Sequence, residues 1–156
     1  MAVLVSIVLV RNVLSQPASP RSQGSKLYFE LFWFGLVYGA VDGLFLSVFP
    51  VLVTWQAFPA LGSTTLGKIG VALLALAASV VIAIAYHAGY PEFRNSSMRF
   101  AAIGNGIISI AYLVSLNPIS SFASHAVMHI VAVWHGSEGT VQLPPHYGNT
   151  GKKQTA

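Results

Sequence analysis

Long runs of apolar residues, separated by short polar segments, make up most of the chain. About 20 helical residues, each rising 1.5 Å, cross the roughly 30 Å hydrocarbon core of a bilayer. The runs are of this length or slightly shorter, which predicts four membrane-spanning helices at residues 27–49, 66–90, 100–117 and 119–136. The expected fold is therefore all-α, a polytopic integral membrane four-helix bundle.

Proline residues mark two ends of the predicted helices. The first helix is expected to end at Phe49, and Pro50 to kink or loosen that end, because a proline nitrogen cannot donate a backbone hydrogen bond. Asn117-Pro118 is a turn signal between the third and fourth helices. These two helices should therefore form a tight antiparallel hairpin.

The chain outside the four helices forms two further regions. It begins with MAVLVSIVLV, which is apolar but too short to cross a bilayer, and continues with a Pro/Ser-rich linker. We expect residues 1–26 to comprise this apolar segment, as an interfacial or a partial helix, and the polar linker. Residues 27–136 are then the membrane domain, and residues 137–156 a loosely ordered cytoplasmic tail.

The composition excludes several classes of protein. Hydrophobic residues make up 54% of the chain and charged residues only 8%, whereas soluble domains carry roughly 25% charged residues. The eight basic residues are scattered between apolar runs, so they do not form a nucleic-acid-binding patch. The chain has no cysteine, which excludes disulfides, iron–sulfur clusters and thiolate metal sites.

The positions of the basic residues predict the topology. With four crossings, three basic segments fall on one side of the membrane and a single lysine, Lys68, on the other. Loops rich in Lys and Arg stay in the cytoplasm. We therefore expect a protein of the plasma membrane with both termini in the cytoplasm. The basic residues on that side are Arg11, Arg21, Lys26, Arg94, Arg99, Lys152 and Lys153.

Three glycines in the first predicted helix lie on one helical face. Gly35, Gly39 and Gly43, in the stretch FGLVYGAVDG, have GxxxGxxxG spacing. In a bilayer, small residues of this kind let helix backbones approach closely. The face is expected to pack within the bundle. A cofactor, a second copy of the chain or another membrane protein is the alternative occupant.

Ionisable residues inside the predicted helices are the candidate functional groups. Such residues are costly at membrane depth and usually face the bundle interior and a partner. Depth, counted at 1.5 Å per residue from the predicted helix ends, places them in three layers. The layers pair Asp42 with His125, Asn105 with His129, and His87 with His135.

The first two of these layers suggest a divalent metal site or a group that handles protons. His125 and His129 are four residues apart, so both rings project from one face of a helix and can bind one metal ion. Asp42 is the third ligand that depth places best, and Asn105 would support the ligands by hydrogen bonding. The same histidines can instead make two hydrogen bonds between helices.

Two other functional classes remain open. His87 and His135 have matched depth on facing helices and are the natural axial pair for a b-type haem in an electron-transfer protein. Alternatively, the chain is a structural or assembly subunit whose polar residues specify packing. It carries no P-loop, Rossmann fingerprint, HExxH or GxSxG motif, so no reaction is assigned.

Overall fold

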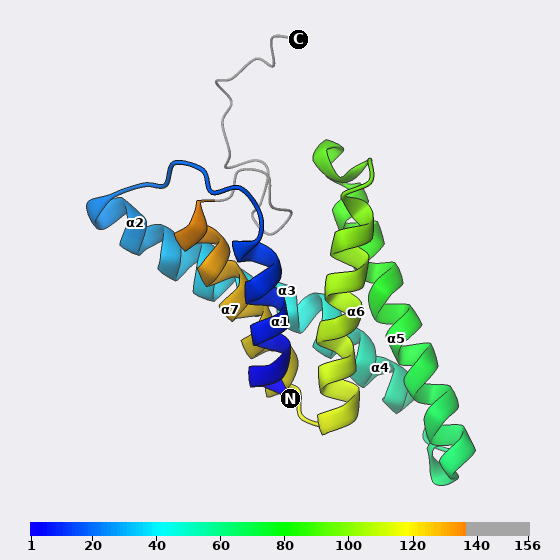
Figure 1. The fold of residues 1–156 in the computed structure, drawn as a ribbon. Coiled ribbons are helices and arrows are strands. Elements are labelled where there is room, and N and C mark those ends of the chain that lie inside the picture. Colours follow the sequence, from blue (N-terminus) through cyan, green and yellow to red (C-terminus); the bar gives the residue numbers. More distant parts are fainter. Residues whose placement is uncertain (137–156) are drawn as a thin grey trace.

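The computed structural model describes residues 1–136, and every regular element in that range is helical, with no β-strand (Figure 1). The predicted cytoplasmic tail, residues 137–156, lies outside the described residues. The α-helices are α1 (Ala2–Leu14), α2 (Gly24–Glu30), α3 (Gly39–Gly43), α4 (Phe49–Ala57), α5 (Thr65–Ala88), α6 (Met98–Ser115) and α7 (Ile119–His135). Two π-helical stretches, η1 (Leu31–Tyr38) and η2 (Leu44–Val48), and two short 3-10 turns, η3 (Leu61–Ser63) and η4 (Pro91–Phe93), complete the fold.

The elements α2, η1, α3, η2 and α4 form one continuous helix, Gly24–Ala57, of 34 residues. The prediction that this helix ends near Pro50 is wrong. Pro50 has no N–H for the carbonyl oxygen of Leu46, four residues earlier. That oxygen instead accepts hydrogen bonds from Ser79 Oγ at 2.7 Å and Asn105 Nδ2 at 3.3 Å. Because α5 and α6 satisfy the freed carbonyl, the helix continues past the proline.

Three helices of the described part are long and apolar enough to cross a membrane, namely Gly24–Ala57, α5 and α6. Helix α7, the fourth predicted span, is slightly shorter at 17 residues. It begins after the Asn117-Pro118 turn, where Leu116 adopts a left-handed conformation with φ of 52°. As predicted, α7 then runs back antiparallel to α6 (Figure 1).

The apolar N-terminal segment is a 13-residue helix, α1, that packs against α7 and α6. Its buried side chains are Val5, Leu9 and Val13, which share a core cluster with residues of α6 and α7, including Ile108 and Met128. The short length agrees with a partial helix. The description as a bundle of four helices is nevertheless incomplete, because α1 is a fifth packed member.

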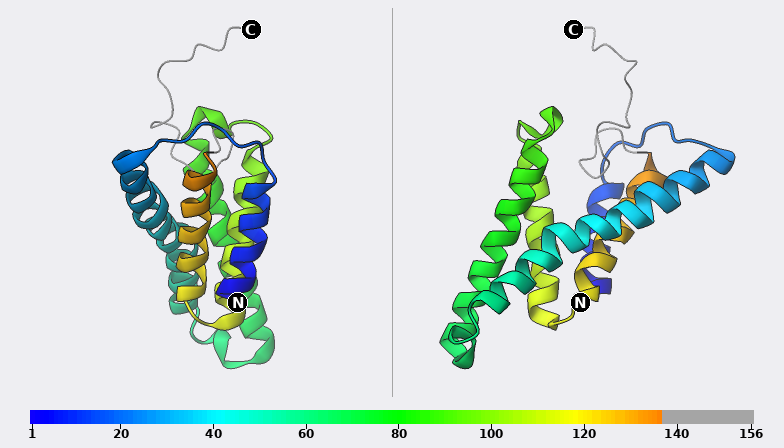
Figure 2. Two further views of the ribbon diagram at one scale, coloured as in Figure 1. Left: turned by 60° about the vertical axis from the view of Figure 1, so that its left-hand side comes forward. Right: turned by 180° about the vertical axis from the view of Figure 1, so that it is seen from behind.

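The long helix crosses the other helices diagonally and holds them together (Figure 2). The pair α1 and α7 lies against its first half, through contacts of α7 with η1 and α3. The pair α5 and α6 lies against its second half, where α5 contacts α4. Asp42, on α3, therefore sits in the middle of the molecule, where the long helix passes both pairs.

Polar residues are inside this assembly and large apolar residues are outside. Leucine, isoleucine, valine and phenylalanine side chains are exposed along every long helix, as with Leu66, Leu73, Val81 and Val114. Exposed apolar surface of this extent is typical of sites that contact a membrane or another protein. The buried polar residues are Asp42, Ser47, Thr54, Ser79, Asn105, Ser109, Ser120, Ser121, Ser124, His125 and His129.

Candidate metal centre

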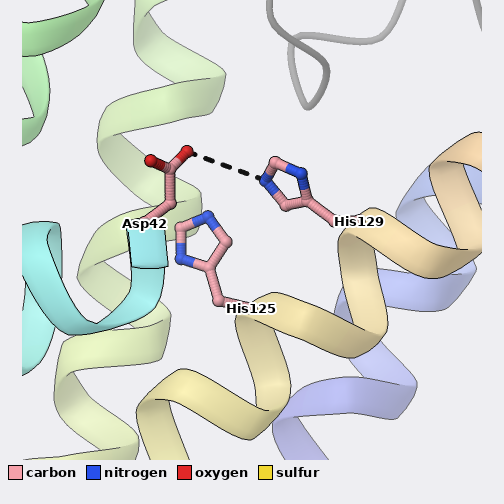
Figure 3. Close-up of side chains that lie close together, drawn as sticks. All are labelled: Asp42, His125 and His129. Carbon is pink, nitrogen blue, oxygen red and sulfur yellow. Dashed lines mark ion pairs between the residues drawn. The ribbon is translucent and has the colours of Figure 1, made fainter. Parts of the chain in front are cut away.

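Asp42, His125 and His129 form a buried cluster between the long helix and α7. One potential ligand atom from each residue lies within 4.8 Å of the others. The exposed fractions of the three residues are 7%, 5% and 2%. Figure 3 shows both imidazole rings, on consecutive turns of α7, beside the Asp42 carboxyl group on α3. The structure thus brings together the three residues that spacing and depth predicted as metal ligands.

The glycine face brings these helices close enough for the cluster to form. A Cβ atom on Gly39 would lie 2.8 Å from His129 Cβ, and one on Gly43 would lie 3.0 Å from His125 Cβ. A Cβ on Gly35 would lie 3.0 Å from the Cα of Ile130. The face is therefore covered by α7 along its whole length. The packing of the face within the bundle agrees with the first expectation, and a second copy of the chain or another membrane protein at this face stays a prediction.

The spacing of the ligand atoms is close to that of a tetrahedral metal site. His129 Nε2 lies 3.9 Å from Asp42 Oδ2, and the two imidazole centroids are 5.1 Å apart with ring planes inclined by 39°. An ion bound at 2.0–2.2 Å separates its ligand atoms by roughly 3.3–3.6 Å. Small side-chain rotations would close the remaining gap. In contrast, 3.9 Å is too long for a direct hydrogen bond.

The two imidazole rings lack the hydrogen bonds that buried rings normally make. The Nδ1 atoms of His125 and His129 are both buried without a hydrogen-bond partner. The Phe34 backbone, on the long helix, also interacts with the His129 ring. Each unpaired buried polar atom costs about 1–3 kcal/mol. The hydrogen bonds of the described residues therefore leave one nitrogen atom of each ring unexplained.

Asp42 lies between two π-helical stretches, η1 and η2. The wider π-helical turn is rare and is frequently found at functional sites. No sequence pattern predicted these stretches, because their residues are as apolar as those of the neighbouring α-helical turns.

Two tyrosines that the sequence analysis did not predict lie next to the cluster. The Tyr38 ring packs against His129 with centroids 5.8 Å apart, and the Tyr38 and Tyr86 hydroxyl groups are hydrogen-bonded. The Tyr86 hydroxyl group is also close enough to the Asp42 carboxyl group to influence it. A signal for Tyr38 was present, because it lies four residues before Asp42 on the same helical face. Tyr86 had no such signal.

Asn105 belongs to a different polar cluster from the one predicted. Its Oδ1 accepts a hydrogen bond from Ser47 at 2.9 Å, and its Nδ2 donates to Ser79 Oγ at 2.8 Å. Ser79 is also hydrogen-bonded to Ser109 at 2.6 Å. These bonds join the long helix to α5 and α6, so Asn105 holds helices together rather than supporting the histidines.

The two histidines considered as haem ligands have separate contacts in the structure. His87 Nδ1 lies 2.7 Å from the Ala83 carbonyl oxygen, and its ring packs against Phe93 with centroids 4.6 Å apart. His135 Nε2 lies 2.8 Å from the Gln16 carbonyl oxygen. The C-terminal ends of α5 and α7, which carry these residues, lie apart (Figure 2, right).

Comparison of the chain with protein-family models, curated proteins and solved structures found no match. Its function is therefore argued from the Asp42, His125 and His129 cluster itself.

Proposed function

We propose that the chain is a polytopic membrane protein that binds one divalent transition-metal ion, zinc by preference, through Asp42, His125 and His129. One observation carries this proposal. Three buried ligand groups converge within 4.8 Å, and both imidazole rings lack a hydrogen-bond partner on Nδ1. Buried polar groups without partners are rare in folded proteins and call for a specific explanation.

The distribution of side chains supports the membrane part of the proposal. Large apolar residues face outward on the three longest helices. Helix α7 would be the fourth crossing, since 17 helical residues span about 26 Å, at the short end of the usual range. The ends of α1, α5 and α7 and the starts of α2 and α6 lie at one end of the molecule (Figure 1). That end carries Arg11, Arg21, Lys26, Arg94 and Arg99, which favours its location in the cytoplasm.

The ligand set indicates zinc rather than a harder cation. Magnesium and calcium prefer oxygen ligands, whereas two imidazoles and one carboxylate suit Zn²⁺. Ferrous iron also accepts two histidines and a carboxylate, so iron is the main competitor. Three protein ligands leave one coordination position for water or a substrate group, as in catalytic zinc sites.

Elemental analysis of the purified protein tests the proposal. The protein is extracted in detergent without chelators, and zinc, iron and copper are measured relative to protein. We expect about one zinc ion per chain, which is lost in His125→Ala and in His129→Ala. His135→Ala is the matched control, because His135 lies on the same helix and contacts Gln16 instead of the cluster; it should retain the metal.

Two results would contradict the proposal. The first is wild-type protein that holds no metal after exposure to zinc and dialysis. The second is a Soret absorption band with stoichiometric iron that depends on His87 and His135, which would establish the haem alternative.

A further inference from the structure

We infer that Tyr86 is a positioning residue of the metal centre, whose hydroxyl group orients the Asp42 carboxylate for metal binding. This inference rests on the proposed function. It extends the site to a third helix, α5, which supplies none of the three ligands.

The position of Tyr38 places Tyr86 beside the ligands. Tyr38 and Asp42 are one helical turn apart and share a face of the long helix. The Tyr38 ring packs against His129, and its hydroxyl group is hydrogen-bonded to that of Tyr86. Tyr86 is therefore bonded to a residue that contacts one ligand, His129, and lies one helical turn from another, Asp42.

The hydrogen bonds of Tyr86 leave its proton for Asp42. A phenolic hydroxyl group has one proton to donate and lone pairs to accept. Tyr90 donates to the Tyr86 oxygen at 3.4 Å, and Tyr38 can donate to the same oxygen. With both acting as donors, the Tyr86 proton is left for another acceptor, and the Asp42 carboxylate, one helical turn from Tyr38, is the acceptor that the inference assigns to it.

A carboxylate held in this way keeps a fixed orientation toward the two imidazoles. Groups that hydrogen-bond to metal ligands set their orientation, and removing one typically lowers metal affinity 10- to 100-fold. The Tyr86 ring packs edge-on against the rings of Tyr90 and His87, with centroids 5.5 Å and 5.2 Å apart. Phenylalanine at this position preserves that packing and removes only the hydroxyl group.

The test compares Tyr86→Phe with Tyr28→Phe in the full-length protein. Tyr28 is 73% exposed and remote from the cluster, so its substitution is a matched loss of one hydroxyl group. Zinc affinity is measured by competition with a chelating dye. Co²⁺ is then substituted for zinc, and its visible absorption reports the coordination geometry. We expect Tyr86→Phe to weaken zinc binding at least 10-fold and to change the Co²⁺ spectrum, while Tyr28→Phe changes neither.

Each outcome has a definite meaning. If wild type and Tyr86→Phe bind zinc equally and share one Co²⁺ spectrum, the inference is overturned and the metal site stands. If the wild-type protein binds no metal, the proposed function fails and the inference fails with it. If Tyr86→Phe does not fold, Tyr38→Phe replaces it, since it removes a donor that holds the Tyr86 hydroxyl group and retains the ring against His129. A smaller loss of zinc affinity is then expected, together with a changed Co²⁺ spectrum, and an unchanged affinity and spectrum would overturn the inference.

Discussion

At the scale of single residues, the molecule contains two buried polar clusters of opposite character. In the cluster of Ser47, Ser79, Asn105 and Ser109, every side chain is hydrogen-bonded. In the Asp42 cluster, two imidazole nitrogens have no hydrogen-bond partner. Satisfied networks fix packing, whereas local inconsistencies of this kind concentrate at functional sites. The first cluster is therefore structural, and the second is the candidate for chemistry.

This contrast predicts the effect of Asp42→Asn. The amide has the same shape as the carboxylate but carries no charge to bury, so metal-free protein should be slightly more stable. We expect its Tm to rise by about 2–4 °C, equivalent to about 1 kcal/mol. Zinc at 100 times Kd should stabilise wild type by about 2.7 kcal/mol and have little effect on the variant. Thermal unfolding in detergent, with and without zinc, measures both effects. A lower Tm without zinc would show that Asp42 is a structural partner of His129.

At the scale of helices, the site depends on how closely α7 approaches the long helix. Gly39 and Gly43 are in contact with α7 at the two turns that carry the histidines. Backbone atoms such as Ala126 Cα, 2.9 Å from a Cβ on Gly39, cannot move without displacing the helix. The same glycines therefore determine both helix packing and the distance between the ligands.

Gly39→Ala should consequently impair stability and metal binding together. Overpacking of this kind costs about 1–3 kcal/mol, and the displaced α7 should lower zinc affinity. Gly104→Ala is the control, because a Cβ there has no heavy atom within 4 Å; it should be neutral or stabilising by up to about 1 kcal/mol. Thermal unfolding and zinc titration distinguish the two variants. Equal behaviour of both would show that the close approach of α7 is unimportant.

The continuity of the long helix through Pro50 also depends on its neighbours. Ser79→Ala removes one of the two donors to the Leu46 carbonyl oxygen and should cost about 1–2 kcal/mol. Pro50→Ala supplies an N–H to the same oxygen, so Ser79→Ala should cost less in that background. A double-mutant cycle of unfolding free energies measures the coupling. Additive effects would mean that Ser79 does not compensate for the proline.

At the scale of the whole molecule, charge and apolar surface agree on one orientation. Five cations of the described residues lie at the end of the molecule that contains the α1–α2 linker and the α5–α6 loop, and Lys68 lies at the opposite end. The side walls between these ends are apolar. This arrangement suits a bundle that crosses a bilayer with its basic end in the cytoplasm.

Labelling of single cysteines tests this orientation, because the native chain has none. Ser25→Cys and Ser96→Cys place a thiol at the basic end, and Ser63→Cys places one at the other end; all three positions are exposed. In intact cells, an impermeant maleimide should react with Ser63→Cys alone. After lysis all three variants should react. Labelling of Ser25→Cys but not Ser96→Cys in intact cells would rule out the proposed topology.

The depth of each residue along its helix was predictable from the sequence. The convergence of Asp42 with His125 and His129 follows from helical rise and four-residue spacing alone. The direction in which each helix faces was not predictable. Asn105 shares the depth of His129 but faces Ser79, and the π-helical stretches alter the rotation of the long helix.

The packing of α1 into the core could not be predicted, for a related reason. Val5, Leu9 and Val13 recur every four residues, which is the pattern of a buried helical face. Their neighbours are equally apolar, so no buried stripe stands out in the sequence. Similarly, the two donors that satisfy the Leu46 carbonyl oxygen come from α5 and α6, and nothing near Pro50 indicates them.

The ligands come from the two extremes of the membrane domain, and this has a consequence during biosynthesis. Asp42 leaves the ribosome about 90 residues before His129, an interval of roughly 4–18 s at ordinary rates of translation. Throughout that time the Asp42 carboxyl group lies in the nascent bundle without the His125 and His129 rings. The site is completed only when α7, the last helix of the described residues, docks on the glycine face. If the proposed function is correct, metal can therefore be loaded only after this step, and a chain truncated before α7 should be made without metal.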